Sequence, residues 1–224
     1  MKALTVGLVT SALLLSCSRE MPPTPTQEPA QELRDAIASL DLAKVKALTP
    51  KTISIDQEVG TGVHPPGDTP LALVLWEANK IRRSEMAVEI MKYLIDEGAD
   101  VNRPDRNGRT LLHFPHNYDA VKILLNNGAK VDTYASDDGT SPLYRTDNLR
   151  LLGLLVPVAK NINSIDKSGK TALDYHMQWD YSRKEIISLL RAHGAKTSAE
   201  LEIHNQLLHR TAPTADAVSE VDEL

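Results

Sequence analysis

The chain has 224 residues, of which 42% are hydrophobic, 25% are charged and only 4% are aromatic. A core made of Leu, Ala, Val and Ile with few rings favours packed helices over a β-sandwich. The formal net charge is -5, and segment 199–224 alone holds six acidic residues and one basic residue. The rest of the chain therefore sums to zero, which gives no electrostatic support for nucleic-acid binding.

The first 16 residues have the parts of an export signal. Lys2 precedes an uncharged stretch of thirteen residues, 3–15, which is too short to cross a bilayer because a helix needs about 20 residues. Residues 14–17, Leu-Leu-Ser-Cys, resemble the lipobox of bacterial lipoproteins. The resemblance implies that residues 1–16 are removed and that Cys17 is acylated. The alternative is an ordinary signal peptide with an incidental cysteine.

Residues 17–31 are expected to form a tether. Four prolines in 18–31 favour an extended chain, which at about 3.1 Å per residue reaches roughly 40 Å. Ser18, rather than Asp, follows the cysteine, and this resembles lipoproteins sorted to the outer membrane. We therefore expect a chain anchored by lipid in the outer membrane and facing the periplasm.

A motif of the form Gly-x-[Ser/Thr]-x-Leu recurs along the body of the chain. It begins at Gly67, Gly108, Gly139 and Gly169, with separations of 41, 31 and 30 residues. An apolar pair follows each copy, and three of these pairs lead into Gly-Ala. The pattern resembles the ankyrin repeat, in which Gly-x-Thr-Pro-Leu-His opens the first of two helices. The resemblance implies an all-α repeat fold, an ankyrin-repeat solenoid of helix-turn-helix units with hairpin loops.

The motif divides the chain into an array over 32–198 and a C-terminal segment. The first unit is a weaker copy that lacks the opening motif, and the second unit is longer than the family spacing, so both of its helices should be extended. Side chains at the start of each first helix are expected to cap it. Segment 199–224 is expected to hold a capping helix, with Leu201, Leu207 and Leu208 facing inward, and an acidic disordered tail. The five units are 32–66, 67–107, 108–138, 139–168 and 169–198, and the capping residues are Thr69, Thr110, Ser141 and Thr171.

No catalytic or metal-binding pattern stands out. The sequence has no Gly-x-Ser-x-Gly elbow, Walker loop or dinucleotide fingerprint. His113 and His116 lie three residues apart, but His113 occupies the structural histidine of the repeat motif. The runs SDDG and DKSG lack the alternating oxygen ligands of a calcium loop and predict hairpin turns. We therefore expect a protein that is not an enzyme and that needs no metal or cofactor.

Binding to another protein is the remaining function. In ankyrin arrays the partner usually meets the hairpin tips and the inner helices, and Trp, Tyr and Arg are common at interface hot spots. The alternative for the two tryptophans is that they fill gaps beside irregular helices. Carried over by position, the candidate partner-binding residues are Trp76, Arg103, Arg106, Arg109, Tyr134, Asp137, Asp138, Lys167 and Trp179.

The expected partner follows from location and resemblance. Bacterial lipoproteins of this kind resemble immunity proteins that protect the periplasm against secreted lipase-type toxins. The first interpretation is therefore an immunity protein that neutralises a toxin such as a type VI secretion phospholipase. The alternative is a periplasmic scaffold that supports a resident enzyme, for which a catalase-linked exported ankyrin protein is the family precedent.

Overall fold

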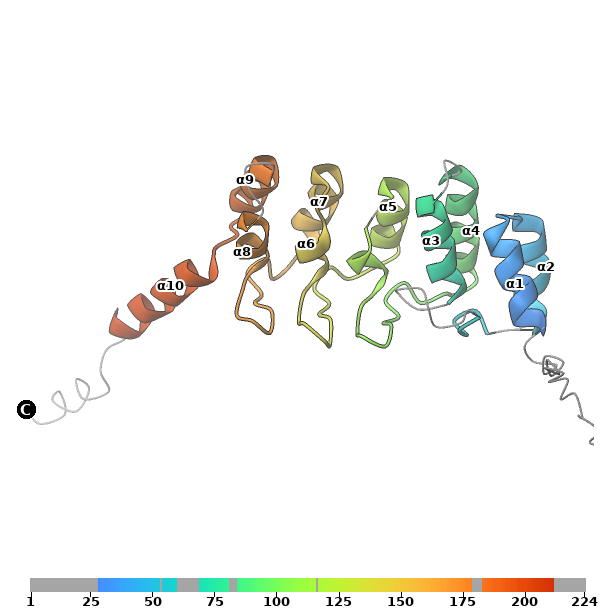
Figure 1. Ribbon diagram of the computed structural model, residues 1–224, viewed down its shortest axis with the longest axis horizontal. Helices are drawn as coiled ribbons and strands as arrows, with labels where there is room; N and C mark the ends of the chain where they lie inside the picture. Colours follow the sequence, from blue (N-terminus) through green and yellow to red (C-terminus); the bar gives the residue numbers. More distant parts are fainter. Residues whose placement is uncertain are drawn as a thin grey trace, which may run out of the picture.

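The computed structural model describes residues 28–52, 54–59, 69–80, 84–115, 117–178 and 183–211. Within these ranges the chain forms helices and no β-strand longer than an isolated β-bridge. Successive helices pair into hairpins that stand side by side in a row (Figure 1). The pairs are α1 Glu28–Ala38 with α2 Leu42–Thr52, α3 Pro70–Lys80 with α4 Ser84–Asp96, the 3-10 turn η1 Leu111–His113 with α5 Tyr118–Asn126, α6 Pro142–Arg145 with α7 Leu149–Leu155 and η2 Val156–Val158, and α8 Ala172–Met177 with α9 Lys184–Ala192.

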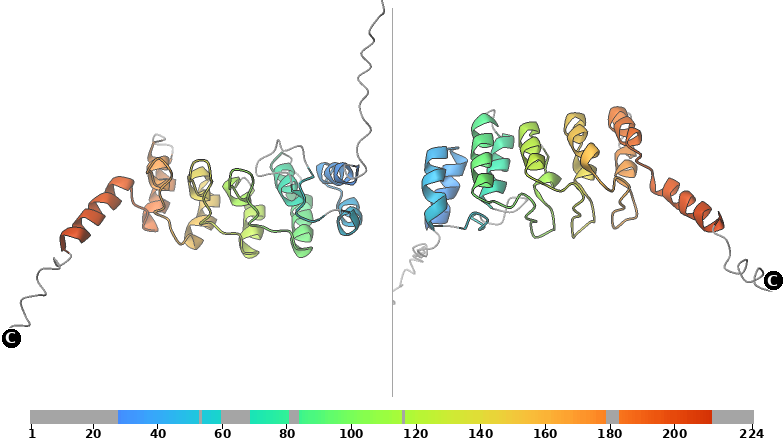
Figure 2. Two further views of the ribbon diagram at one scale, coloured as in Figure 1. Left: turned by 90° about the horizontal axis from the view of Figure 1, so that it is seen from below. Right: turned by 180° about the vertical axis from the view of Figure 1, so that it is seen from behind.

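The helices form two layers, which are plain when the row is seen from below (Figure 2). In the inner layer α1 packs on α3, and α6 packs on both η1 and α8; in the outer layer α4, α5, α7 and α9 contact one another in turn. The core lies between the layers and continues through the whole row. Its fully buried side chains include Leu33, Ile37, Leu71, Leu75, Ile90, Leu94, Leu112, Leu124, Leu143, Tyr144 and Leu152.

The inner helices differ in length as the motif spacing predicts. In the long second unit α3 has 11 residues and α4 has 13, whereas η1 has 3 and α6 has 4. Pro115 follows η1 closely, and proline cannot donate the N–H that another helical turn needs. In the next unit the Thr146 hydroxyl donates to the Pro142 carbonyl at 2.8 Å, which satisfies a carbonyl that the short helix α6 leaves free.

The expected helix caps are present in part. The Thr69 hydroxyl accepts from the Ala72 N–H at 3.2 Å, and the Thr171 hydroxyl accepts from the Asp174 N–H at 3.2 Å. The prediction is wrong for Ser141, whose side chain makes no cap hydrogen bond. The N–H of the third helical residue, Tyr144, donates to the Ser141 backbone carbonyl at 3.1 Å instead of to the hydroxyl.

The C-terminal helix α10, Ser198–Thr211, leaves the stack at an angle (Figure 1). The Arg191 guanidinium contacts the Glu200 carboxylate at 2.6 Å and ties the start of α10 to α9. Leu201 is half-buried, but residues 202–206 are all exposed. The capping role predicted for this helix therefore stays a prediction. The side chains of Leu207 and Leu208 lie outside the described residues.

Candidate protein-binding surface

Three loops, 100–110, 131–141 and 162–171, project from one edge of the array, and we call them the first, second and third fingers (Figure 1). A backbone hydrogen bond closes each finger at the same place. The donors and acceptors are Asp105 N–H to Arg109 C=O at 2.8 Å, Ala135 N–H to Thr140 C=O at 2.9 Å, and Asp166 N–H to Lys170 C=O at 2.8 Å. These bonds fix which residues of the fingers are structurally equivalent.

Neighbouring fingers are joined to one another by their backbones. The Ser136 N–H donates to the Asn107 carbonyl at 2.6 Å, and the Lys167 N–H donates to the Asp138 carbonyl at 2.9 Å. The Lys167 ammonium also reaches the Ser136 carbonyl at 2.6 Å. The finger row is therefore one hydrogen-bonded edge rather than a set of independent loops.

A charged cluster reinforces the junction of the first two fingers. The Arg109 guanidinium lies 2.5 Å from Asp137 and 3.4 Å from Asp138, and Arg145 lies 2.5 Å from Asp138. Burial raises the pKa of Asp138, but the Thr140 hydroxyl and N–H, and then Arg145 and Arg109, lower it to about 2. Because the Arg109 side chain is only 16% exposed, most of its surface serves the fold.

The histidine position of the repeat motif links each unit to the next, with different chemistry each time. His113 accepts from the Thr110 N–H through Nδ1 at 3.0 Å, so its Nε2–H donates to the Thr140 carbonyl at 3.2 Å. At the equivalent position the Tyr144 hydroxyl lies 2.7 Å from the Ser164 carbonyl and 2.8 Å from the Lys170 carbonyl. Both side chains hold the base of the following finger.

In the last unit the same position is occupied by an acid. Asp174 accepts from the Thr171 N–H at 2.9 Å and from the Ser198 N–H at 2.8 Å, so it fixes the start of α10. Burial raises the pKa of this carboxyl, but the Thr171 and Ser198 hydrogen bonds outweigh burial and lower it. The linking role is thus kept although the residue type changes.

An apolar row runs across the three fingers. Pro104, Tyr134 and Ile165 each stand one residue before the closing hydrogen bond, and all three are exposed. Tyr134 is 42% exposed and Ile165 is 58% exposed, so both offer apolar surface to a partner. The finger edge, defined as this row with the charged residues around it, is the candidate binding surface. Sequence reasoning found Tyr134 but missed Pro104 and Ile165.

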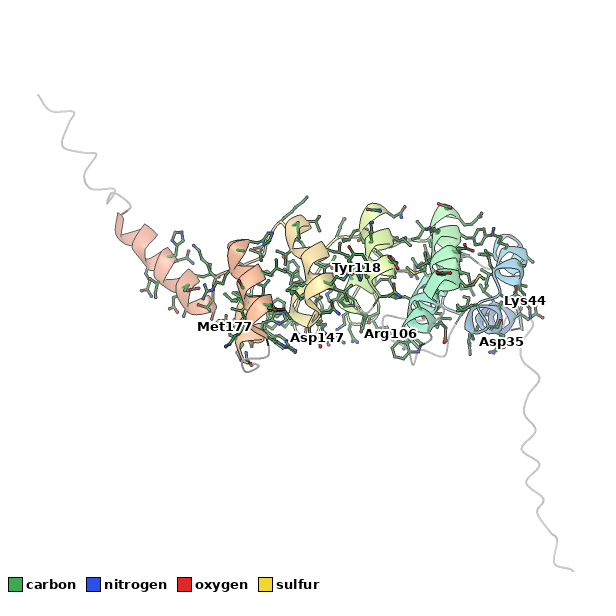
Figure 3. All side chains as sticks on the ribbon, turned by 90° about the horizontal axis from the view of Figure 1, so that it is seen from above. Asp35, Lys44, Arg106, Tyr118, Asp147 and Met177 are labelled. Carbon is green, nitrogen blue, oxygen red and sulfur yellow. The ribbon has the colours of Figure 1, made fainter. Side chains whose placement is uncertain are left out.

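The structure divides the other predicted residues into two groups. Arg103 and Arg106 are exposed on the first finger, and Arg106 lies 3.7 Å from Glu58. Figure 3 shows Arg106 on the same long edge of the array as Asp147 and Met177. The second group bonds to neighbouring fingers and consists of Arg109, Asp137, Asp138 and Lys167. Trp76 belongs to neither group and is half-buried on α3. Trp179 and Cys17 lie outside the described residues.

The described residues hold no group of three or more His, Cys, Asp or Glu side chains placed to bind a metal ion. Among the same residues, no helix is both long enough and apolar enough to cross a bilayer.

The fold and its linked fingers define an ankyrin-repeat domain, and comparison with known proteins agrees. Residues 45–137 match the family model for ankyrin repeats in three copies. This confirms the predicted all-α ankyrin-repeat fold. Ankyrin-repeat domains are typically non-catalytic modules that bind other proteins, so the match supports protein binding as the function.

The chain is also similar to parts of much longer proteins. It is 33% identical over 122 residues to neurogenic locus notch homolog protein 1 of Mus musculus and 31% identical over 134 residues to neurogenic locus notch homolog protein 2 of Homo sapiens. These alignments cover 52% and 53% of the chain but only 5% of each relative. The similarity therefore concerns the repeats and carries no information about a shared partner.

Proposed function

We propose that this chain is a non-enzymatic ankyrin lipoprotein that binds a protein partner at the periplasmic face of the outer membrane. The observation that carries the binding role is the finger edge. It presents an exposed apolar row of Pro104, Tyr134 and Ile165 on loops that are already joined by hydrogen bonds. A surface that is rigid before binding loses less conformational entropy on association.

The charges around the row suit a specific partner. Arg103 and Arg106 are exposed on the first finger. Arginine is common at interface hot spots because its planar guanidinium donates two parallel hydrogen bonds to one carboxylate. Arg109 and Arg145 instead neutralise Asp137 and Asp138 within the array. Arg103 forms no ion pair with a residue that the structure describes, and Arg106 makes only an exposed contact of 3.7 Å with Glu58. The partner should therefore place acidic groups at the first finger.

The proposed location and role come from the N-terminal sequence. Cys17 and the stretch before it resemble a lipobox, and acylation there would hold the array near a membrane. We propose an immunity function on this basis: the array occupies a secreted, periplasm-acting toxin such as a type VI secretion phospholipase. A tethered inhibitor would stand where such an enzyme attacks lipid.

Two measurements test this proposal. A strain that lacks the protein should grow normally alone and should be killed by kin cells that deliver an active toxin. Sickness without any attacker would point instead to a scaffold for a resident enzyme. The full chain should also retain the toxin from periplasmic extract, and Tyr134→Ala and Arg106→Ala should each weaken the complex by about tenfold, the size of a hot-spot loss.

A further inference from the structure

A second exposed apolar surface lies on the opposite side of the array from the inner helices. It belongs to α7 and η2, where Leu149, Gly153, Pro157 and Val158 are exposed and Leu154 is half-buried against the core. Leu149 is 37% exposed and Val158 is 51% exposed. Outer helices of a repeat array normally face water with polar side chains, so we call these residues the outer strip. It extends about 15 Å, the length of ten helical residues.

The one charged residue within the strip is turned to a neighbour. The Arg150 guanidinium stacks over the Tyr118 ring, 3.9 Å from its centre. This contact ties α7 to α5 and places the guanidinium over a ring of α5. The space beside Gly153, in the middle of the strip, is open, because a Cβ built there would meet no atom within 4 Å.

Gly153 has no structural reason to be glycine in the described array. Its φ is not positive, and the space around it is open. A glycine inside a helix is less stable than alanine at the same position. What glycine does offer is a close approach to the helix backbone by something outside the array.

At its C-terminal end, at Val158, the strip borders a groove between two units. The groove has a volume of about 380 Å³, and its apolar walls are Leu125, Ala129, Val131 and Val158. Lys130 and Lys160 line the same groove and are exposed. Neither ammonium group forms an ion pair with any residue that the structure describes.

The one acid in the groove is already occupied. The Asp132 carboxylate accepts from the Lys160 N–H at 2.8 Å and from the Asn161 N–H at 2.9 Å. The equivalent residue in the next unit is Asn163, which accepts from the Lys196 N–H at 2.7 Å and carries no charge. The groove therefore combines an apolar floor with net positive charge at its rim.

We propose that the outer strip and its groove form a second protein-binding surface, whose occupant is an amphipathic acidic helix of a partner protein. The apolar face of that helix packs along the strip and crosses α7 closely at Gly153. An apolar side chain enters the groove, and carboxylates beside it pair with Lys130 and Lys160. A concave groove suits an inserted side chain better than it suits a flat lipid surface. The array then binds two proteins at once, one at the finger edge and one here.

Selection of peptides tests this surface directly. A display library of random 12-residue peptides is selected against the full-length chain, and enriched sequences are compared with those from variants. We expect apolar residues at helical spacing flanked by Asp or Glu. Their enrichment should fall at least tenfold with Lys130→Glu/Lys160→Glu and with Gly153→Leu. The second variant is informative because leucine favours the helix, so loss of binding cannot come from unfolding.

Matched controls separate this surface from the finger edge and from general charge. Lys92→Glu reverses one charge on α4, away from the strip, where the double variant reverses two, and Tyr134→Ala alters the finger edge; both should keep the enrichment. The proposal is overturned if no such peptides are enriched, if the controls lose them as well, or if only vesicles of phosphatidylglycerol bind in a way that depends on Lys130 and Lys160. Failure of the finger-edge variants in the toxin assay would not affect these results.

Discussion

Gly108 sits where the first finger meets the second, and its replacement gives a direct measure of that junction. Its φ is +73°, and a Cβ at this position would lie 2.9 Å from the Ser136 backbone nitrogen. Gly128 is a matched control, since its φ is +82° but a Cβ there meets nothing within 4 Å. Alanine in the left-handed region costs about 1–2 kcal/mol, and both variants pay that cost.

Only Gly108→Ala also places its Cβ too close to the Ser136 backbone nitrogen. The Ser136 nitrogen cannot retreat without lengthening its 2.6 Å hydrogen bond to the Asn107 carbonyl. A lost hydrogen bond costs about 1 kcal/mol, and forced repacking adds about 1–3 kcal/mol. We expect Gly108→Ala to reduce the free energy of unfolding by about 2–4 kcal/mol more than Gly128→Ala, measured by urea denaturation with far-UV circular dichroism. Equal losses would show that the fingers are not packed edge to edge.

Three further variants test other links in the array. Burial lowers the pKa of His113 and of His176 from 6.5. As the pH drops from about 6.5 toward 5, the unfolded chain therefore takes up protons before the folded chain does, and the stability of the fold decreases. In thermal melts this decrease should be smaller for His176→Gln and unchanged for the exposed control His193→Gln. Tyr144→Phe keeps the ring but removes its contacts with two carbonyls, and should cost about 1–3 kcal/mol in urea denaturation; no loss would mean that water replaces them. The pKa of Asp138 is about 2, against an ordinary 3.8, so the stabilisation by its charge is present above about pH 3.8 and is lost toward pH 2. Because the side chain is 38% exposed, Asp138→Asn should lower the free energy of unfolding by about 1 kcal/mol at most near pH 7 and should cause little loss near pH 2. An equal loss at both pH values would show that the charge has no role.

The sequence predicted the repeat fold because each Gly-x-[Ser/Thr]-x-Leu opening encodes a local turn and helix start. Pro115 and the 30-residue and 31-residue spacings also account for the short inner helices, because they leave no room for another turn. The role of Arg109 was not predictable from spacing. Its partners Asp137 and Asp138 lie 28 and 29 residues away, in the next finger, and only the packing of units brings them together.

The exposed apolar residues show the same limit. Ile165 reads as an ordinary apolar residue beside a turn, and its 58% exposure depends on how the third finger packs. Aligning the fingers on their glycines does not reveal the row, because the second finger has one more residue between the closing bond and its glycine. The start of α10 is held by Asp174 and Arg191, which the leucine pattern of the helix does not indicate.

The most direct test of the account is a calorimetric titration of the full-length chain with the periplasmic protein that it retains, once that protein is purified. We predict a complex whose affinity falls about tenfold or more with Ile165→Ser and with Tyr134→Ala, while Lys92→Glu leaves it unchanged. Equal affinity for the wild type and both finger-edge variants would contradict the claim that this protein works by binding through its finger edge.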